Sequence, residues 1–475
     1  MPNPNDPERV TVLEASAGTD QWPRIGSEAQ ALLATPDVAS LGESSDRVLE
    51  EALAILRRCD GVRTGASANV GLATGYVQSG KTLSFTTVCA LARDNGIPLI
   101  IVITGISTNL FDQSNRRLER DLRLLTRLDR KWLHVSIDTR APSPAQRIAD
   151  TLSDWRDEAV ADARRQSVLI TVMKNSFHLE YLIRALEGVD LNGVPTLLID
   201  DEGDQASLNY LVNRGRESTT YRYIARLRRL IPRHAYVQYT ATPQAPLLIN
   251  IIDALSPSFA EVLTPGPGYT GGATFFCADG TRRFVRTIPA SEIMGATQQA
   301  LVAPPDSFRA AVATFFVGVA AGELTEEGRG NRSMMVHPHQ SRALHADYFV
   351  WAESLKADWQ RALLAAPADG SRQQVLQLLR DAYDDLATTA TDLPNWEALT
   401  LALPRAMRRT AIWQVNALRG QTPTIPWREN YSQILVGGQA MDRGFTVEGL
   451  TVTYMPRGLG DGNADTLYGD RKSVV

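Results

Sequence analysis

The chain has 475 residues, of which 44% are hydrophobic and 21% are charged, and its formal net charge is −4. This composition is typical of a globular protein of two to four domains, and it argues against a uniformly basic surface that would coat nucleic acid. Only five of the 49 basic residues are lysines, a bias that a GC-rich genome explains better than DNA binding does.

No targeting or membrane segment is recognisable in the sequence. The N-terminus lacks the basic-then-apolar pattern of a secretory signal, and no apolar run approaches the ~20 residues that span a bilayer. The scattered Cys59, Cys89 and Cys277 fit neither a disulfide framework nor metal-ligand spacing. We therefore expect a cytoplasmic protein.

The first sixty residues divide into an arm and a helical segment. Residues 1–25 are rich in Pro, Asn and Asp, which predicts a loose arm. Residues 28–58 follow a Ser/Asp cap with helical periodicity. We expect residues 1–60 to be an N-terminal arm and helical segment outside the first sheet.

Short apolar runs alternate with helix-length amphipathic segments over residues 61–254. The runs read ANVGLAT, IPLIIVIT, KWLHVSI, QSVLITV, VPTLLID and AYVQYTAT. Runs of this length with helices between them are typical of buried parallel strands in βα units. The pattern predicts a doubly wound α/β domain.

A Pro/Gly-rich interval over residues 255–305 is expected to be an insert or linker. After it, helical patterns surround three further strand-like runs, RSMMVH, YSQILVGG and LTVTYM. We expect a second α/β domain over residues 306–468. The predicted fold class is therefore α/β, with two tandem parallel-sheet domains.

The stretch GYVQSGKT, residues 75–82, predicts a phosphate-binding loop. Its two glycines permit a tight loop whose N–H groups face phosphate oxygens, and the segment after it predicts a helix whose N-terminus points at the anion. Lys81 would reach the β- and γ-phosphates, and the Thr82 hydroxyl would hold Mg²⁺. The predicted nucleotide-binding residues are Gly75, Gln78, Ser79, Gly80, Lys81 and Thr82.

The stretch TLLIDDEGDQAS is a buried strand followed by acidic residues. In α/β sheets, ligands bind at the carboxyl ends of strands, where this run delivers Asp200, Asp201 and Glu202. Asp201 would bind Mg²⁺ through water, and Glu202 would polarise the attacking water. The alternative is an acidic helix N-terminus stabilised by the dipole, but the position after a phosphate-binding loop favours the nucleotide site.

The stretch YTATPQAPL ends another apolar strand. Alone it is a strand-to-turn transition stopped by Pro243. Because it follows the acidic strand, Thr240 and Thr242 are expected to couple the nucleotide site to a neighbouring domain.

The order GxxxxGKT, DEGD (201–204) and TAT resembles the superfamily-two helicase core. More narrowly, VQSGKT, IDDEGDQAS, YTATPQAPLLIN, GYTGGATFF and GGQAMDRGFTVEGLTVTYMPR are similar to the Z1 (Z-one) domain family over about residues 65–467. Proteins of that family carry the label of endonucleases, are related to superfamily-two helicases, and occur in bacterial restriction and defence neighbourhoods. The resemblance implies two RecA-like domains, ATP and Mg²⁺ as ligands, and DNA or a protein of a defence complex as partners.

Further site residues are implied by this resemblance. Within VITGISTNLFDQSNRRL (102–118), the segment expected to touch a nucleic-acid backbone, the candidates are Thr104, Gly105, Gln113, Arg116 and Arg117. The alternative is that residues 115–132 form a solvated helix of mixed charge. In the second domain, DRGFTVEGL resembles helicase motif five and would place Asp442, Arg443 and Gly444 at the nucleotide cleft, Arg443 on the nucleotide. His337 and His339 are expected to be strand-end residues, because no other metal ligands cluster near them.

The C-terminal sequence departs from the family pattern. Where an arginine-bearing sixth motif is expected, the chain reads GNADTLYGDRKSVV, and DRKSVV matches the translation of a common sequencing adapter. We expect residues 469–475 to be non-native and the second domain to be truncated. Losing an arginine finger costs about 10³–10⁵ in rate.

Three functions are compatible with these features. The first is an ATP-driven helicase-like motor on DNA in a restriction or defence system. The second is a nuclease, for which the nearest match is Asp129-Arg130-Lys131 beside Asp112 or Asp121, in a mixed-charge region without a clear hairpin. The third is a nucleotide-dependent switch that binds a protein partner.

Overall fold

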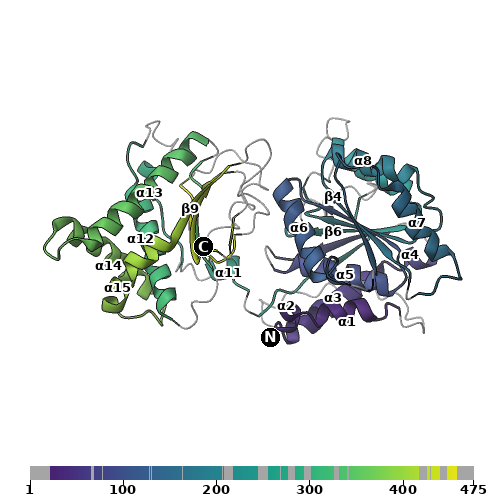
Figure 1. Cartoon of the computed structure of the whole chain (residues 1–475), viewed down its shortest axis with the longest axis horizontal. Helices are drawn as coiled ribbons and strands as arrows, with labels where there is room; N and C mark the ends of the chain where they lie inside the picture. Colours follow the sequence, from purple (N-terminus) through teal and green to yellow (C-terminus); the bar gives the residue numbers. More distant parts are fainter. Residues whose placement is uncertain are drawn as a thin grey trace, which may run out of the picture.

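The computed structural model describes most of the chain between residues 22 and 456. The described residues are 22–65, 69–76, 79–127, 129, 131–162, 164–205, 207, 218–243, 246, 255–267, 269–275, 284–293, 301–325, 331–339, 342–416, 425–427, 429–438 and 447–456. Figure 1 shows two lobes, the N-terminal one in purple to teal and the C-terminal one in green to yellow.

The N-terminal lobe contains a seven-stranded parallel sheet in the order β3-β4-β2-β5-β6-β1-β7. Its strands are β1 (Asn69–Thr74), β2 (Leu99–Thr104), β3 (Trp132–Ser136), β4 (Ser167–Met173), β5 (Thr196–Asp201), β6 (His234–Thr240) and β7 (Phe259–Val262). The first six coincide with the six predicted apolar runs. Strands with both faces buried must be apolar throughout, which is why their sequences do not alternate.

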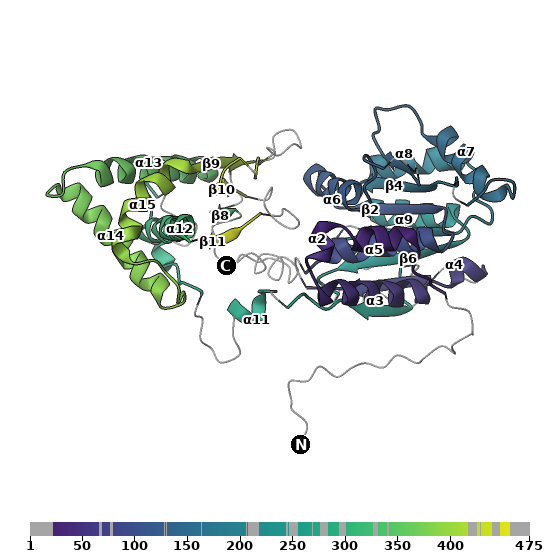
Figure 2. The same ribbon diagram turned by 60° about the horizontal axis from the view of Figure 1, so that its bottom comes forward.

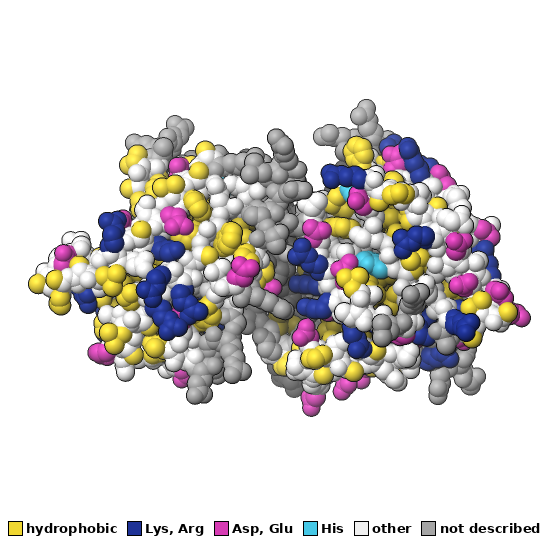
Figure 3. All heavy atoms as spheres, in the orientation of Figure 1, with side chains coloured by type: hydrophobic (Ala, Val, Ile, Leu, Met, Phe, Trp, Pro, Cys, Tyr) yellow, Lys and Arg dark blue, Asp and Glu magenta, His cyan; other side chains and the backbone are white. Residues whose placement is uncertain are grey.

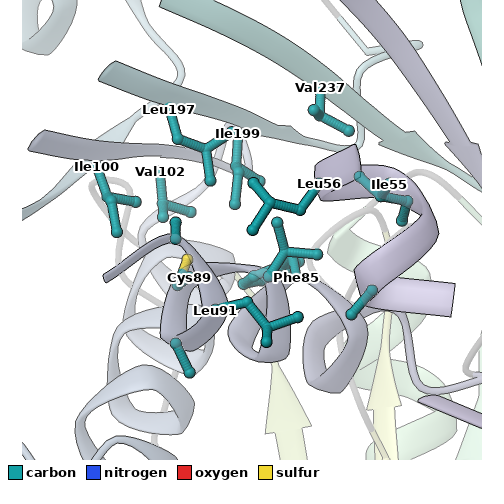
Figure 4. Close-up of a cluster of buried hydrophobic side chains, with 14 of the residues drawn as sticks. Ile55, Leu56, Phe85, Cys89, Leu91, Ile100, Val102, Leu197, Ile199 and Val237 are labelled. Carbon is teal, nitrogen blue, oxygen red and sulfur yellow. The ribbon is translucent and has the colours of Figure 1, made fainter. Parts of the chain in front are cut away.

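Helices cover both faces of this sheet, with α7 and α8 on one side and α1, α3 and α5 on the other (Figure 1). The helices of this lobe are α1 (Ser27–Leu33), α2 (Pro36–Ala39), α3 (Glu43–Arg58), α4 (Gly61–Thr64), α5 (Lys81–Asp94), α6 (Thr108–Asp121), α7 (Ala145–Arg156), α8 (Ser176–Glu187) and α9 (Thr219–Leu230). In β2, Ile100 and Val102 point to the first core and Ile101 to the second. Figure 4 shows the first core, where Phe85 and Cys89 of α5 and Leu56 of α3 meet the strands.

The helical segment expected over residues 28–58 consists of three helices in the structure. Pro36 begins α2, since proline lacks an N–H and fits the first helical position. Gly42, at φ +56°, precedes α3 in a conformation that favours glycine. The cap of α1 comes from α5: the Asp94 carboxylate accepts from the N–H groups of Gly26, Glu28 and Ala29.

The first sheet also extends past the expected boundary at residue 254. Residues 259–262, placed in an insert or linker by the sequence analysis, form β7 parallel to β1. The Phe259 ring lies against Gly71 and leaves no room there for a Cβ. The Pro/Gly-rich composition hid this strand because it has only four residues and lies at the sheet edge. The helix α11 (Gly272–Phe275) and a 3₁₀ turn at Ala290–Glu292 follow it.

The C-terminal lobe contains a four-stranded parallel sheet in the order β11-β8-β10-β9. Its strands are β8 (Arg332–Val336), β9 (Thr410–Val415), β10 (Ser432–Gly437) and β11 (Leu450–Tyr454), and its helices are α12 (Asp306–Leu324), α13 (Arg342–Leu364), α14 (Gly370–Ala387) and α15 (Trp396–Arg409). The sequence analysis missed β9. With two parallel sheets, the predicted α/β class with two tandem parallel-sheet domains is confirmed.

Helix α12 is both long and apolar. Among the described helices it alone is long and apolar enough to cross a membrane, and 56% of its most apolar window is buried inside the protein. Phe308, Phe315 and Phe316 pack into the core of the second lobe with Trp359 of α13. In Figure 2, α12 lies among α13, α14 and α15, as expected for a core helix.

Candidate nucleotide-binding site

The predicted phosphate-binding loop connects β1 to α5. Gly80 is the N-cap of α5 at φ +98°, a left-handed conformation that side chains with a Cβ rarely adopt. A Cβ at Gly75 would lie 3.0 Å from Ser79 Oγ and 3.1 Å from Lys81 Cγ. The backbone therefore favours glycine at position 80, and a Cβ at position 75 would crowd the Ser79 and Lys81 side chains. Gln78 lies outside the described residues.

Lys81 and Thr82 stand at the first turn of α5. The Lys81 side chain is buried, and Nζ donates to the Tyr76 carbonyl oxygen at 3.2 Å, as Ser79 Oγ does at 2.8 Å. Thr82 Oγ1 accepts a hydrogen bond from Arg117 Nη1 of α6 at 3.1 Å. The loop thus holds its lysine folded back on itself, where the ammonium can exchange a carbonyl partner for a phosphate oxygen.

The acidic residues lie at the carboxyl end of β5, on the same edge of the parallel sheet as the loop. Burial raises the pKa of Asp201 to about 6; Glu202 acts in the same direction, and Lys174 and Lys81 oppose it. Ser114 Oγ of α6 donates to Asp201 Oδ2 at 3.4 Å. Because α6 contacts Asp201 through Ser114 and Thr82 through Arg117, the loop and the acidic strand end lie together.

Asp200 differs from its two neighbours because it points into the protein. Its carboxylate is fully buried, with Oδ1 2.7 Å from Lys174 Nζ, and Oδ2 accepts from the Tyr236 hydroxyl. Lys174 also donates to the carbonyl oxygens of Asp201 and Glu202. The sequence analysis missed Lys174; its only signal was a lysine directly after an apolar strand in a lysine-poor chain.

The TAT residues contact the end of the acidic motif. Thr240 Oγ1 donates to Asp204 Oδ1 at 2.6 Å, and Thr242 Oγ1 donates to Asp204 Oδ2 at 2.5 Å. Gly203 N–H donates to the Tyr239 carbonyl at 2.9 Å, with Gln238 too close for a Cβ. The sequence analysis quoted Asp204 but assigned it no role, although the motif order would have paired it with the threonines.

The structure distributes the five nucleic-acid candidates over different environments. Thr104 is buried, with its hydroxyl on the Val172 carbonyl, and Gly105 is buried against Leu110. The Thr104 side chain is buried because β2 is a central strand of the sheet. Arg117 lies on Thr82 in the nucleotide site.

The remaining candidates face outward from α6. Arg116 is exposed and Gln113 is half-buried, and the next turn carries the exposed Arg120. Helix α6 ends at Asp121 and Trp132 begins β3, so the solvated helix over 115–132 is also wrong as stated. Figure 3 shows Lys and Arg side chains gathered on the edge of the first lobe that borders the second.

The expected second-domain residues Asp442, Arg443 and Gly444 lie outside the described residues, as does the segment 469–475. His337 and His339 directly follow β8, and the His339 carbonyl oxygen lies 2.7 Å from His345 Nε2. Within the described part of the chain, no three His, Cys, Asp or Glu side chains group as metal ligands.

Two of the three acids considered for a nuclease site are engaged in separate ion pairs. Asp129 accepts from Arg127, and Asp121 accepts from Arg120. Asp112 is exposed on α6. Arg130 lies outside the described residues. The described side chains thus do not form the paired-carboxylate cluster that this chemistry requires.

Comparison with known proteins agrees with this arrangement. Residues 307–469 match the model of the Z1 domain family. No curated protein matches the chain in sequence.

The solved structures to which the chain is similar include three helicases or helicase domains. The DUF1998 helicase MrfA bound to DNA is matched over 95% of this chain and 46% of its own, at 10% identity and a TM-score of 0.45. Saccharomyces cerevisiae Dbp5, bound to RNA and ADP BeF3, is matched over 91% of this chain and 96% of its own, at 13% identity and a TM-score of 0.34. The helicase domain of Pyrococcus furiosus Hef is matched over 88% of this chain and 96% of its own, at 12% identity and a TM-score of 0.35. This chain therefore spans less than half the length of the MrfA chain.

Proposed function

We propose that the protein binds ATP and Mg²⁺ at the β1–α5 loop and hydrolyses ATP as a helicase-like motor on DNA. The observation that carries the proposal is that the β1–α5 loop and the acidic end of β5 lie at one sheet edge and both contact α6, with Asp204 bonded to both threonines of the TAT turn. A phosphate loop alone is common to many proteins. Its combination with the acid-to-threonine contact is typical of machines that turn hydrolysis into domain movement.

The residues have separable roles in this reaction. Backbone N–H groups of the loop and the Lys81 ammonium would bind the β- and γ-phosphates. Bound Mg²⁺, held by Thr82 and through water by Asp201, would neutralise charge on the transferred phosphoryl group. Glu202 would accept a hydrogen bond from the attacking water. The water oxygen bonds to the γ-phosphorus as the bond to the bridging oxygen breaks, and the water's proton passes through Glu202 to solvent or phosphate, yielding ADP and inorganic phosphate.

The proposal that DNA is the partner is based on the outward face of α6. Its exposed Arg116 and Arg120 lie one turn apart, and arginines bind backbone phosphates without reading sequence. Because α6 also carries Ser114 and Arg117 on its inner face, a contact outside can reach the nucleotide site through a single rigid element. A role in bacterial restriction or defence, within the cytoplasm, follows from the Z1 resemblance and belongs to the same proposal.

The test measures ATP hydrolysis with and without single- or double-stranded DNA. Lys81→Ala and Glu202→Gln are expected to lower the rate by at least about 100-fold, since each removes a group used in the transition state. Lys131→Ala, which changes a lysine of the same domain outside the site, is the matched control and should hydrolyse ATP normally.

Each alternative function has its own result in this experiment. Hydrolysis unaffected by DNA, with DNA binding insensitive to salt, would contradict the motor and favour a protein-binding switch. DNA cleavage that survives both substitutions would reveal an independent nuclease site.

A further inference from the structure

We propose that Lys174 is a positioning residue that sets the backbone of Asp201 and Glu202, and so aims the Glu202 carboxylate for hydrolysis. Lys174 follows the last residue of β4, and its side chain is fully buried. The inference rests on the proposed ATP hydrolysis and goes beyond it, because Lys174 touches neither the phosphate loop nor any group expected to contact ATP.

Three oxygen atoms surround the Lys174 ammonium. Nζ donates hydrogen bonds to the carbonyl oxygens of Asp201 at 2.6 Å and Glu202 at 2.7 Å. It also forms an ion pair with Asp200, with Oδ1 at 2.7 Å. The buried side chain is therefore held between two backbone carbonyls and one carboxylate.

The contact falls where the backbone leaves the regular strand. Glu202 has φ +54°, which a residue with a Cβ adopts only when its surroundings hold it there. Two carbonyl oxygens at the turn accept from one ammonium, so the peptide planes on both sides of the Glu202 Cα are tied to a single point. These planes set the direction of the Glu202 Cα–Cβ bond. Lys174 therefore determines the direction in which the Glu202 side chain leaves the backbone.

Lysine rather than arginine suits this position. The chain uses arginine for 44 of its 49 basic residues, yet a lysine stands here. Three acceptors around one nitrogen match a compact ammonium, whereas a planar guanidinium spreads its donors over a wider fork. The Lys174 N–H also donates to the Gly105 carbonyl at 3.2 Å, which joins this support to the loop after β2.

Removing Lys174 alone would leave the Asp200 carboxylate buried and unpaired, so the substitution must replace the whole cluster. The variant changes Lys174→Met, Asp200→Leu and Tyr236→Phe together, because buried ionic groups can be exchanged for apolar residues of similar volume without unfolding. Lys356→Met is the matched control: its Nζ donates to the Thr410 carbonyl at 2.7 Å in the other lobe. Thermal unfolding first establishes that both variants are folded.

The readouts are kcat for ATP hydrolysis and the Kd of a non-hydrolysable ATP analogue with Mg²⁺. We expect kcat of the triple variant to fall about 100-fold, the scale of a misplaced general base, while Kd changes less than about 3-fold. Lys356→Met should change neither. A folded triple variant with wild-type kcat would overturn the inference, and so would a parallel loss of kcat, Kd and thermal stability.

The proposed function fails in a different way from the inference. If the wild-type protein hydrolyses ATP and Glu202→Gln does not, the function stands and the triple variant decides the role of Lys174. If the wild-type protein does not hydrolyse ATP, or Glu202→Gln retains full activity, both proposals are overturned.

Discussion

Arg117 of α6 donates a hydrogen bond from Nη1 to Oγ1 of Thr82, the first hydroxyl of the helix after the phosphate loop, at 3.1 Å. The guanidinium therefore lies beside the oxygen that is proposed to bind Mg²⁺. Two cations at one hydroxyl repel each other, and the half-buried setting of Arg117 weakens screening by solvent. Mg²⁺ binding at Thr82 is therefore expected to compete with the Arg117 guanidinium.

Arg117→Ala is expected to lower the Mg²⁺ concentration for half-maximal ATP binding by about 3- to 10-fold, the order expected for losing a partly screened cation. The measurement is a Mg²⁺ titration of ATP-analogue binding at constant ionic strength. Arg116→Ala, one residue away and exposed, is the control and should leave the midpoint unchanged. A higher Mg²⁺ requirement in Arg117→Ala would instead place the guanidinium on phosphate.

Thr242→Val is expected to uncouple hydrolysis from DNA. It removes one of the two hydroxyl donors of Asp204 and keeps Thr240 in place. Hydrogen bonds to charged groups are worth about 1.5–3 kcal/mol, enough to favour a different arrangement of the turn. Basal ATP hydrolysis should stay within about 3-fold of wild type while stimulation by DNA falls at least about 10-fold.

The control for Thr242→Val is Thr314→Val, which removes a hydroxyl bonded to the Ala310 carbonyl on α12. It should keep DNA stimulation. Equal loss of basal and stimulated rates in Thr242→Val would mean that Asp204 serves catalysis directly, contrary to the coupling role.

Glu28→Ala is expected to destabilise the first lobe by about 1.5–3 kcal/mol, the order of one hydrogen bond to a charged group, because Arg127 keeps Asp129 as a second partner. Glu28 is 3% exposed, receives Arg127 Nη2 at 2.8 Å and accepts from Trp132 Nε1 at 2.8 Å. These contacts fasten α1 to the start of β3. Urea unfolding monitored by tryptophan fluorescence measures the change.

The comparison for Glu28 is Asp162→Ala, which breaks an exposed pair with Arg165 and should cost less than about 1 kcal/mol. A similar small effect for both variants would show that α1 contributes nothing to the stability of the sheet.

His234 is expected to make the protein less stable in acid. Burial, with the neighbouring Arg228 cation acting in the same direction, lowers the pKa of His234 to about 4, while the Ile231 carbonyl opposes the shift. Nε2 lies 3.0 Å from Arg228 Nε and Nδ1 lies 2.6 Å from the Ile231 oxygen, so the neutral ring with a proton on Nδ1 satisfies both. Protonation would set an N–H against an arginine.

The unfolded chain binds this proton at about pH 6.5, so the stabilisation is complete above that pH and is lost as the pH falls toward 4. The pKa of His234 differs by about 2.5 between the unfolded and the folded chain, which corresponds to roughly 3 kcal/mol of unfolding free energy. His234→Gln should flatten the dependence of unfolding free energy on pH between 6.5 and 4 relative to wild type. His134, whose pKa burial also lowers to about 4, remains as a second contribution in both proteins. An unchanged slope would contradict the prediction.

Most of the fold could be predicted from local patterns, and the two strands that were missed share one cause. Six strands of the first sheet were visible because strands buried on both faces must be continuously apolar. β7 and β9 were missed because an edge strand need not be apolar throughout; β7 alternates half-buried and exposed residues, and much of β9 is half-buried. The sequence pattern before β1 is helical throughout, so it did not show that Pro36 and Gly42 divide this segment into separate helices.

The candidate site divides in the same way. Gly75, Gly80, Lys81, Thr82, Asp201 and Glu202 were assigned from the sequence because their spacing reflects a loop, a helix start and a strand end that are each local. Arg117 was expected on nucleic acid and lies on Thr82, since a helical pattern does not say which face meets the site. Lys174 and Asp204 acquired their roles from contacts with residues 26 to 38 positions away.

The sequence by itself determined that this chain has a phosphate-binding loop, an acidic strand end and a threonine turn in helicase-like order, because each depends on neighbouring residues and their backbone preferences. Only the tertiary structure decided which charges meet: that Asp200 turns inward to Lys174 while Asp201 turns to the site, and that Arg117 lies on Thr82. Parallel strands bring distant strand ends to one edge, and the partner that each side chain finds there is set by sheet order and helix rotation, which no local pattern contains.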